Sequence, residues 1–291
     1  MATTLFLLLV AAGVALFIYI EVFRDKLIRR RHFPQAWIDI LEHNLPAYGA
    51  LDVDEQQRLR ELIQLFLAKK RFYGCAGLEL TDEIRVTIAG QACLLLLGQG
   101  RAVYPKLQSV LVYPSAFRAE REQWSDAGTV HMEEHHLLGE SWELGKVILS
   151  WDDVTRGVSD FTDGQNVVLH EFAHQLDGLS GTTNGAPPLY RNSYQSWARV
   201  FTENFEDLRS RGMRGQPTVL DTYGGTNPAE FFAVSTEAFF ERPFALEARR
   251  PELFEELRRY YNLDPRDWHQ LGQWQGSWPE RCETGPEKPD T

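Results

Sequence analysis

Cysteine is scarce in this chain, and its scarcity excludes several kinds of structure. The 291 residues contain only three cysteines, Cys75, Cys93 and Cys282, and no two of them form a CxxC pair. Such an odd, widely spaced set provides neither a disulfide framework nor a cysteine-based zinc site, and it fits a reducing compartment. The sequence therefore predicts a chain that folds without disulfide bonds.

Positive charge is also in deficit. Lysine and arginine number 30 against 41 acidic residues, which gives a net charge of −11. This balance argues against a general binder of nucleic acid, which would present a basic surface. Hydrophobic residues make up 43% and charged residues 24% of the chain, as in a globular protein, and the length allows one large domain or two small ones.

One segment lacks charge altogether. Residues 2–20, ATTLFLLLVAAGVALFIYI, contain no charged side chain, and as a helix they would extend roughly 28 Å, about the thickness of bilayer hydrocarbon. Five basic residues follow this run and none precedes it, whereas a signal peptide has its basic residues first. We predict a transmembrane anchor over 1–23 and a basic linker over 24–33, at the inner (cytoplasmic) membrane with the remainder facing the cytoplasm. The alternatives are tight peripheral association and a cytoplasmic location.

Apolar periodicity outlines the rest of the chain. Valine-rich and isoleucine-rich runs bounded by turn residues predict strands over 109–117 and 145–151, and the polar stretch 118–144 between them is expected to form a hairpin or loop. Helices are expected over 34–43, 54–70 (with Asp54 as a possible cap), 81–97, 163–177, 190–211, 228–241 and 250–261. We predict one α+β, mostly helical domain over 34–275 with a small sheet, followed by a disordered tail over 276–291.

The stretch VVLHEFAHQLDG, residues 167–178, carries a candidate metal site. His170 and His174 are four residues apart, so on a helix they share one face and can bind one ion. Glu171 is rotated by about 100° from His170, which lets it reach a water at the metal without being a ligand. Metal-assisted hydrolysis needs separate residues as ligands and as base, because the metal lowers the pKa of water and a carboxylate takes the proton. The alternative is two surface histidines on an amphipathic helix.

A catalytic zinc needs a third protein ligand, and the candidates downstream are Asp177, Glu230, Glu237 and Glu241. Asp177 lies one turn past the histidines and is expected to accept a hydrogen bond from a histidine N–H instead. Glu230 and Glu237 are seven residues apart in NPAEFFAVSTEAFFERP, so they share a face of an apolar helix, where a carboxylate needs a metal or a partner.

Glu230 has a competing explanation. With Asn227 as N-cap and Pro228 in the first helical position, Glu230 stands where a glutamate closes a capping box. The two roles are compatible, since a helix N-terminus also keeps a carboxylate ionised.

Two blocks of this sequence, VILSWDDV…GQNVVLHEFAHQLD and YGGTNPAEFFAVSTEAFF, resemble the Mlc titration factor A family of zinc metallopeptidases. More distantly, they are similar to the catalytic domain of anthrax lethal factor, and the resemblance covers roughly residues 30–275. It implies a zincin-like fold and one zinc per chain bound by His170, His174 and Glu230. It also implies that Glu171 is the general base and that Tyr223, seven residues before Glu230, faces the open metal position.

Tyr223 also has an interpretation of its own. It lies in DTYGGTNP, whose glycines permit close backbone approach, so its phenol could donate a hydrogen bond to a developing oxyanion. The alternative is a loop tyrosine that packs on the helix. Residues 146–151 are the best candidate for a strand edge along which an extended peptide binds. The histidines of HMEEHHLLGE, His131, His135 and His136, are expected to lie in a solvated loop.

We therefore expect a zinc-dependent peptidase that acts on a peptide or protein substrate and does not bind nucleic acid directly. The alternative is a metal-stabilised binding protein that sequesters a transcriptional regulator, because the resembling family is named for titrating a sugar-uptake repressor. A third hypothesis is an inactive peptidase retained as a membrane scaffold. Glu171 and Tyr223 favour an enzyme, because a structural zinc site needs neither and is closed by a fourth ligand.

Overall fold

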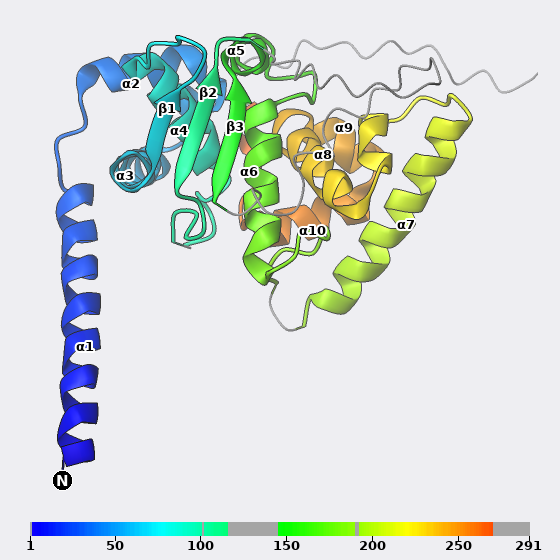
Figure 1. Cartoon of the computed structure of the whole chain (residues 1–291). Coiled ribbons are helices and arrows are strands. Elements are labelled where there is room, and N and C mark those ends of the chain that lie inside the picture. Colours follow the sequence, from blue (N-terminus) through cyan, green and yellow to red (C-terminus); the bar gives the residue numbers. More distant parts are fainter. Residues whose placement is uncertain (1, 101, 116–144, 190–191, 270–291) are drawn as a thin grey trace, which may run out of the picture.

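A computed structural model describes residues 2–100, 102–115, 145–189 and 192–269 (Figure 1). These residues are mostly helical and contain one three-stranded parallel sheet in the order β1-β2-β3, which confirms the expected α+β class. The strands are β1 (Arg71–Gly74), β2 (Ser109–Tyr113) and β3 (Lys146–Ser150). We did not predict β1, because it has only four residues and just one of them is even partly buried.

The N-terminal helix α1 (Ala2–Arg29) stands apart from the rest over most of its length (Figure 1). Its last turns pack on α3, where Ile28 is buried and the Lys69 ammonium lies 2.6 Å from the Asp25 carboxylate. Within the described ranges, no helix combines the length and the apolarity that crossing a membrane requires. The transmembrane part of our prediction is therefore unsupported there.

The N-terminal half contributes three further helices and a short 3₁₀ turn, which pack on one another: α2 (Gln35–Asn44), η1 (Pro46–Ala50), α3 (Val53–Lys69) and α4 (Asp82–Leu94). The predicted cap of α3, Asp54, is wrong by two residues. Asp52 accepts the Glu55 N–H at 2.8 Å, and the Glu55 side chain accepts the Asp52 N–H at 3.1 Å. This reciprocal pair is a capping box, which fixes the start of the helix.

The C-terminal half is helical and packs around α6 (Val167–Asp177), which lies between β3 and α8 (Figure 1). Its other elements are α5 (Trp151–Ser159), η2 (Gly178–Ser180), α7 (Tyr194–Met213), η3 (Thr222–Gly225), α8 (Pro228–Glu241), α9 (Pro243–Arg249), α10 (Pro251–Tyr261) and α11 (Arg266–His269). The predicted bounds of α8 are confirmed. We did not predict α5, α9 and α11, which are short.

The predicted start of α6, at 163, is four residues too early. Gly164 has a φ of +79°, which is outside the helical region. Asn166 instead caps the helix, since its Oδ1 accepts the N–H groups of Val168 at 3.1 Å and Leu169 at 3.0 Å. The stretch 118–144, with its three histidines, and the tail from 276 lie outside the described residues.

Candidate active site

One face of α6 is buried and the other carries the candidate ligands. Its apolar side chains from Val168 onward are fully buried, and the Phe172 ring packs against those of Tyr104, at 4.8 Å between centroids, and Phe66, at 5.6 Å. This packing fixes the rotation of the helix about its axis. His170, Glu171 and His174 therefore lie together on the opposite, partly exposed side.

The ligand atoms of His170, His174 and Glu230 converge on one point. The two histidine Nε2 atoms are 3.3 Å apart, and Glu230 Oε2 lies 3.0 Å from the first and 3.4 Å from the second. Tetrahedral zinc with bonds of about 2.0–2.1 Å would separate its ligand atoms by about 3.3–3.4 Å. The observed spacing is thus close to what one zinc ion requires, and among the described residues these three form the one such group.

The Glu230 carboxylate faces the histidines and not its own helix end. Asn227 caps α8 alone, since its side chain accepts the N–H groups of Ala229 at 2.9 Å and Glu230 at 3.0 Å. Among the described contacts, the Glu230 side chain makes no return bond to the Asn227 N–H. The capping box is therefore not formed, and Glu230 remains a candidate ligand.

The charges of this group support one another. Burial alone would raise the pKa of Glu230, but hydrogen bonds from His170 and His174 lower it well below its ordinary value. Burial would likewise lower the pKa of His170, and hydrogen bonds to Glu230 and Glu237 raise it well above the ordinary value. An ionised side chain without a partner would be costly to bury at this position. The hydrogen bonds between Glu230 and the two histidines therefore stabilise the charged forms of all three side chains.

Glu237 orients His170 from behind. Its Oε1 lies 2.7 Å from His170 Nδ1, and its Oε2 accepts the Asn166 N–H at 2.6 Å. An Nδ1–H donated to this carboxylate leaves Nε2 free to bind a metal. Burial raises the pKa of Glu237, and the bond to His170 offsets part of that rise.

The other two candidates are not ligands in this arrangement. Asp177 accepts the Gly185 N–H at 2.7 Å, and within the described part of the chain it makes no hydrogen bond to a histidine, contrary to our prediction. Glu241 accepts the Asn166 side-chain amide and the Gly164 N–H, both at 3.0 Å. Sequence reasoning assigned neither contact, because both depend on how loops fold back on the helices.

Glu171 is partly buried on α6, and Tyr223 lies beside His170. The centroid of the Tyr223 ring is 6.1 Å from that of the His170 ring, and Tyr223 is 40% exposed. Burial, together with the charges of Glu230 and Glu171, raises the pKa of Tyr223 to about 12. The phenol therefore keeps its proton at neutral pH and can donate it in a hydrogen bond.

Strand β3 borders the site. It is the last strand in the order β1-β2-β3, and it contacts α6. Val147 and Leu149 point into the core, whereas Lys146 and Ile148 are exposed. Residues 146–150 of the predicted edge thus form a strand that contacts the helix carrying His170 and His174, whereas Trp151 is the first residue of α5.

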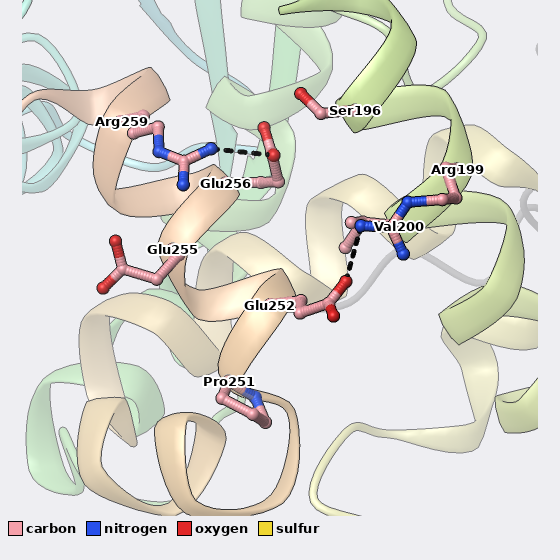
Figure 2. A pocket seen from close by; sticks show the side chains of 8 residues that line it. All are labelled: Ser196, Arg199, Val200, Pro251, Glu252, Glu255, Glu256 and Arg259. Carbon is pink, nitrogen blue, oxygen red and sulfur yellow. Dashed lines mark hydrogen bonds and ion pairs between the residues drawn. The ribbon is translucent and has the colours of Figure 1, made fainter.

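A separate shallow groove of about 340 Å³ lies between α7 and α10, away from the ligands (Figure 2). Its charged side chains bond to one another: Arg199 lies 2.7 Å from Glu252, and Arg259 lies 3.0 Å from Glu256. Its lining residues are Ser196, Arg199, Val200, Pro251, Glu252, Glu255, Glu256 and Arg259. The groove contains none of the candidate catalytic residues.

Residues 20–262, which include all five candidate site residues, match the family model described as glucose-regulated metallo-peptidase M90. The chain belongs to this family. An uncharacterized protein of Synechocystis is 44% identical over 244 residues, which cover 83% of this chain and 89% of that protein. Mlc titration factor A of Yersinia pestis and that of Yersinia pseudotuberculosis are each 32% identical over 262 residues, covering 87% of this chain and 94% of theirs. Membership of the M90 family confirms the resemblance inferred from the two sequence blocks and indicates a metallopeptidase-type protein.

Proposed function

We propose that this protein is a zinc-dependent peptidase. His170, His174 and Glu230 would hold one zinc ion, and the observation that carries the proposal is the convergence of their ligand atoms within 4.8 Å. Zinc, when bound, supplies a Lewis acid that lowers the pKa of water and polarises a carbonyl. Three protein ligands are the set that catalytic zinc sites use, whereas structural sites have four.

Two further side chains supply the proton transfer and the charge stabilisation. Glu171 follows the first ligand on α6 and acts as general base, taking the proton of the attacking water and returning it to the leaving amine. Tyr223 donates a hydrogen bond from its phenol to the oxyanion that forms on the attacked carbonyl. Such a hydrogen bond stabilises the transition state by about 3–4 kcal/mol in comparable sites. Glu237 keeps the His170 ring in the orientation that this chemistry needs.

The substrate is a peptide or protein that binds in extended form along β3. A strand edge offers backbone N–H and C=O groups to an extended chain, and the exposed Lys146 and Ile148 flank this edge. This placement brings a peptide carbonyl towards the ligand group and towards Glu171 and Tyr223.

The second candidate function is sequestration of a transcriptional regulator. It is favoured by the relatives named Mlc titration factor A, which are similar to this chain over most of its length. Binding and peptidase activity are compatible, since the regulator could bind outside the metal site.

We also propose that α1 attaches the protein to the cytoplasmic face of the inner membrane. Its described apolar side chains include Phe6, 67% exposed, and Leu7, 63% exposed, and residues 24–31 add five basic side chains and one acidic one. A local basic cluster next to an apolar segment suits an anionic membrane surface.

Zinc content and hydrolysis of a peptide panel test the peptidase proposal together. We expect about one zinc per chain, and we expect Glu171→Gln to retain zinc while losing about 10²–10⁴ in rate. Glu206→Gln, the same change on the exposed face of α7, is the matched control and should retain wild-type turnover. Near-wild-type turnover by Glu171→Gln would reject the mechanism. Zinc without any turnover by the wild type would favour the binding protein.

A further inference from the structure

The loop between α6 and α7 meets the start of α8 at Gly185. Its N–H donates to Asp177 Oδ2 at 2.7 Å, and its carbonyl accepts the Trp197 indole N–H at 2.9 Å. Its φ is +77°, and a Cβ placed on it would lie 2.3 Å from the carbonyl oxygen of Pro228. One residue thus contacts the end of α6, a buried ring of α7 and the first residue of α8.

These contacts adjoin two metal ligands. Asp177 is three residues after His174, and Pro228 is two residues before Glu230. The gap that Gly185 fills is therefore the gap between the helices that carry the two ligands, whose atoms lie 3.4 Å apart. A change in its width would move Glu230 relative to His174.

Asp177 is poorly suited to a purely packing role. It is fully buried, and its second oxygen, Oδ1, has no hydrogen-bond partner within the described part of the chain. A buried carboxylate oxygen without a partner costs free energy, so its presence in a folded protein calls for an explanation beyond packing. Trp197 is also fixed, since its ring stacks on Phe201 at 3.9 Å between centroids.

We propose that Gly185, held by Asp177, is a positioning residue that sets the spacing between His174 and Glu230. The proposal rests on the zinc site proposed above. Gly185 touches no ligand atom and acts by holding the end of α6 against the start of α8. It predicts that metal affinity depends on a loop glycine outside the ligand set.

The same loop provides a matched control. Gly181 also has a positive φ, +114°, but a Cβ placed there would meet no atom within 4 Å. Gly181→Ala therefore introduces a comparable backbone strain without the collision with Pro228. Any difference between Gly181→Ala and Gly185→Ala reports the contact with α8.

The experiment measures zinc affinity of the full-length protein by competition with a chelator. The visible absorption of cobalt(II) bound in place of zinc reports the ligand geometry, and the melting temperature of the metal-free protein reports the fold. We expect Gly185→Ala to weaken zinc binding by about 10–100-fold and to change the cobalt spectrum. Gly181→Ala should resemble the wild type in both.

Asp177 provides a second pair of variants in case Gly185→Ala does not fold. Asp177→Asn keeps an oxygen that can accept the Gly185 N–H, whereas Asp177→Ala does not, so zinc affinity should fall more in the alanine variant. The positioning role would be overturned if Asp177→Ala matched the wild type in zinc affinity and cobalt spectrum. It would also be overturned if Gly181→Ala and Gly185→Ala lost zinc affinity equally. Neither result would contradict the zinc site. A wild-type protein that takes up no zinc would overturn the zinc site itself.

Discussion

His170 is held between two carboxylates that have different functions. Glu230 approaches its Nε2 at 3.0 Å, on the metal side, and Glu237 approaches its Nδ1 at 2.7 Å, on the opposite side. The two glutamates share a helix face, as their spacing predicted, but only Glu230 lies beside the ring nitrogen of His170 that faces His174. Substitution of Glu230 and substitution of Glu237 should therefore weaken zinc binding to different extents.

We expect Glu230→Gln to abolish or sharply weaken zinc binding, because the amide is a poor ligand and its charge is lost. Glu237→Gln keeps an oxygen that can accept the His170 N–H, so it should weaken zinc only by about 10–100-fold. Zinc content after dialysis and chelator competition measure both. Full zinc occupancy in Glu230→Gln combined with loss in Glu237→Gln would identify Glu237 as the ligand instead.

Tyr223→Phe should lower kcat by about 10²-fold and leave KM nearly unchanged, because the hydroxyl acts only once charge develops on the carbonyl oxygen. The phenylalanine ring keeps the packing beside His170, so a structural role would leave the variant close to wild type. Steady-state kinetics on one peptide, with zinc content measured in parallel, distinguishes the two. A kcat within a few-fold of wild type at full zinc occupancy would require another donor.

Helix α6 is fixed to α8 at its first residues as well as along its length. Asn166 caps α6 with its oxygen and donates its amide to Glu241 at 3.0 Å, and Glu241 is fully buried. Burial raises the pKa of Glu241 well above its ordinary value, although the bond from Asn166 counteracts this. A cap that also satisfies a buried carboxyl group should contribute more than a cap alone.

We predict that Asn166→Ala lowers the free energy of unfolding by about 2–4 kcal/mol, from the lost cap and from the unsatisfied Glu241 oxygen. Thr81→Ala is the matched control, because Thr81 caps α4 through a single bond to the Ile84 N–H at 3.2 Å and should cost about 1 kcal/mol. Urea unfolding of the metal-free proteins measures both. Equal losses would show that the bond to Glu241 contributes nothing.

The distribution of charge over the whole molecule is uneven. The chain carries a net charge of −11, yet five of its 30 basic residues lie between 24 and 31, where α1 meets the rest of the protein. Lys69 with Asp25 and Arg29 with Glu61, at 2.6 and 3.2 Å, join this end of α1 to α3. If α1 binds a membrane, these two ion pairs would therefore keep α3 close to that membrane.

We expect a reporter fused at the C-terminus to be active only in the cytoplasm, and the protein to sediment with membranes. Deletion of residues 1–23 should release it from the membrane fraction, since it removes the apolar run while keeping the contacts of α1 with α3. Periplasmic reporter activity would contradict the proposed orientation. Recovery of the full-length protein outside the membrane fraction would contradict the attachment.

The sequence by itself determined those features that depend on neighbouring residues. The i,i+4 pair of His170 and His174 follows from helical geometry, and the bounds of α8 follow from Asn227, Pro228 and the apolar run after them. Membership of the family could likewise be inferred from the sequence, because each of its two motif blocks consists of residues that are close together in the chain. Strands β2 and β3 could also be predicted, because each contains a local run of apolar residues.

Only the tertiary structure shows which of Glu230 and Glu237 approaches His170 Nε2, because they lie 60 and 67 residues from His170 in the sequence and helical spacing places both on one face. The packing of α6 on α8 sets which carboxylate meets Nε2. Asp177 was assigned to a histidine from sequence, yet its partner is the Gly185 N–H, which a loop brings back to it. Strand β1 likewise exists through its pairing with β2, since four residues carry too little periodicity to specify a strand alone.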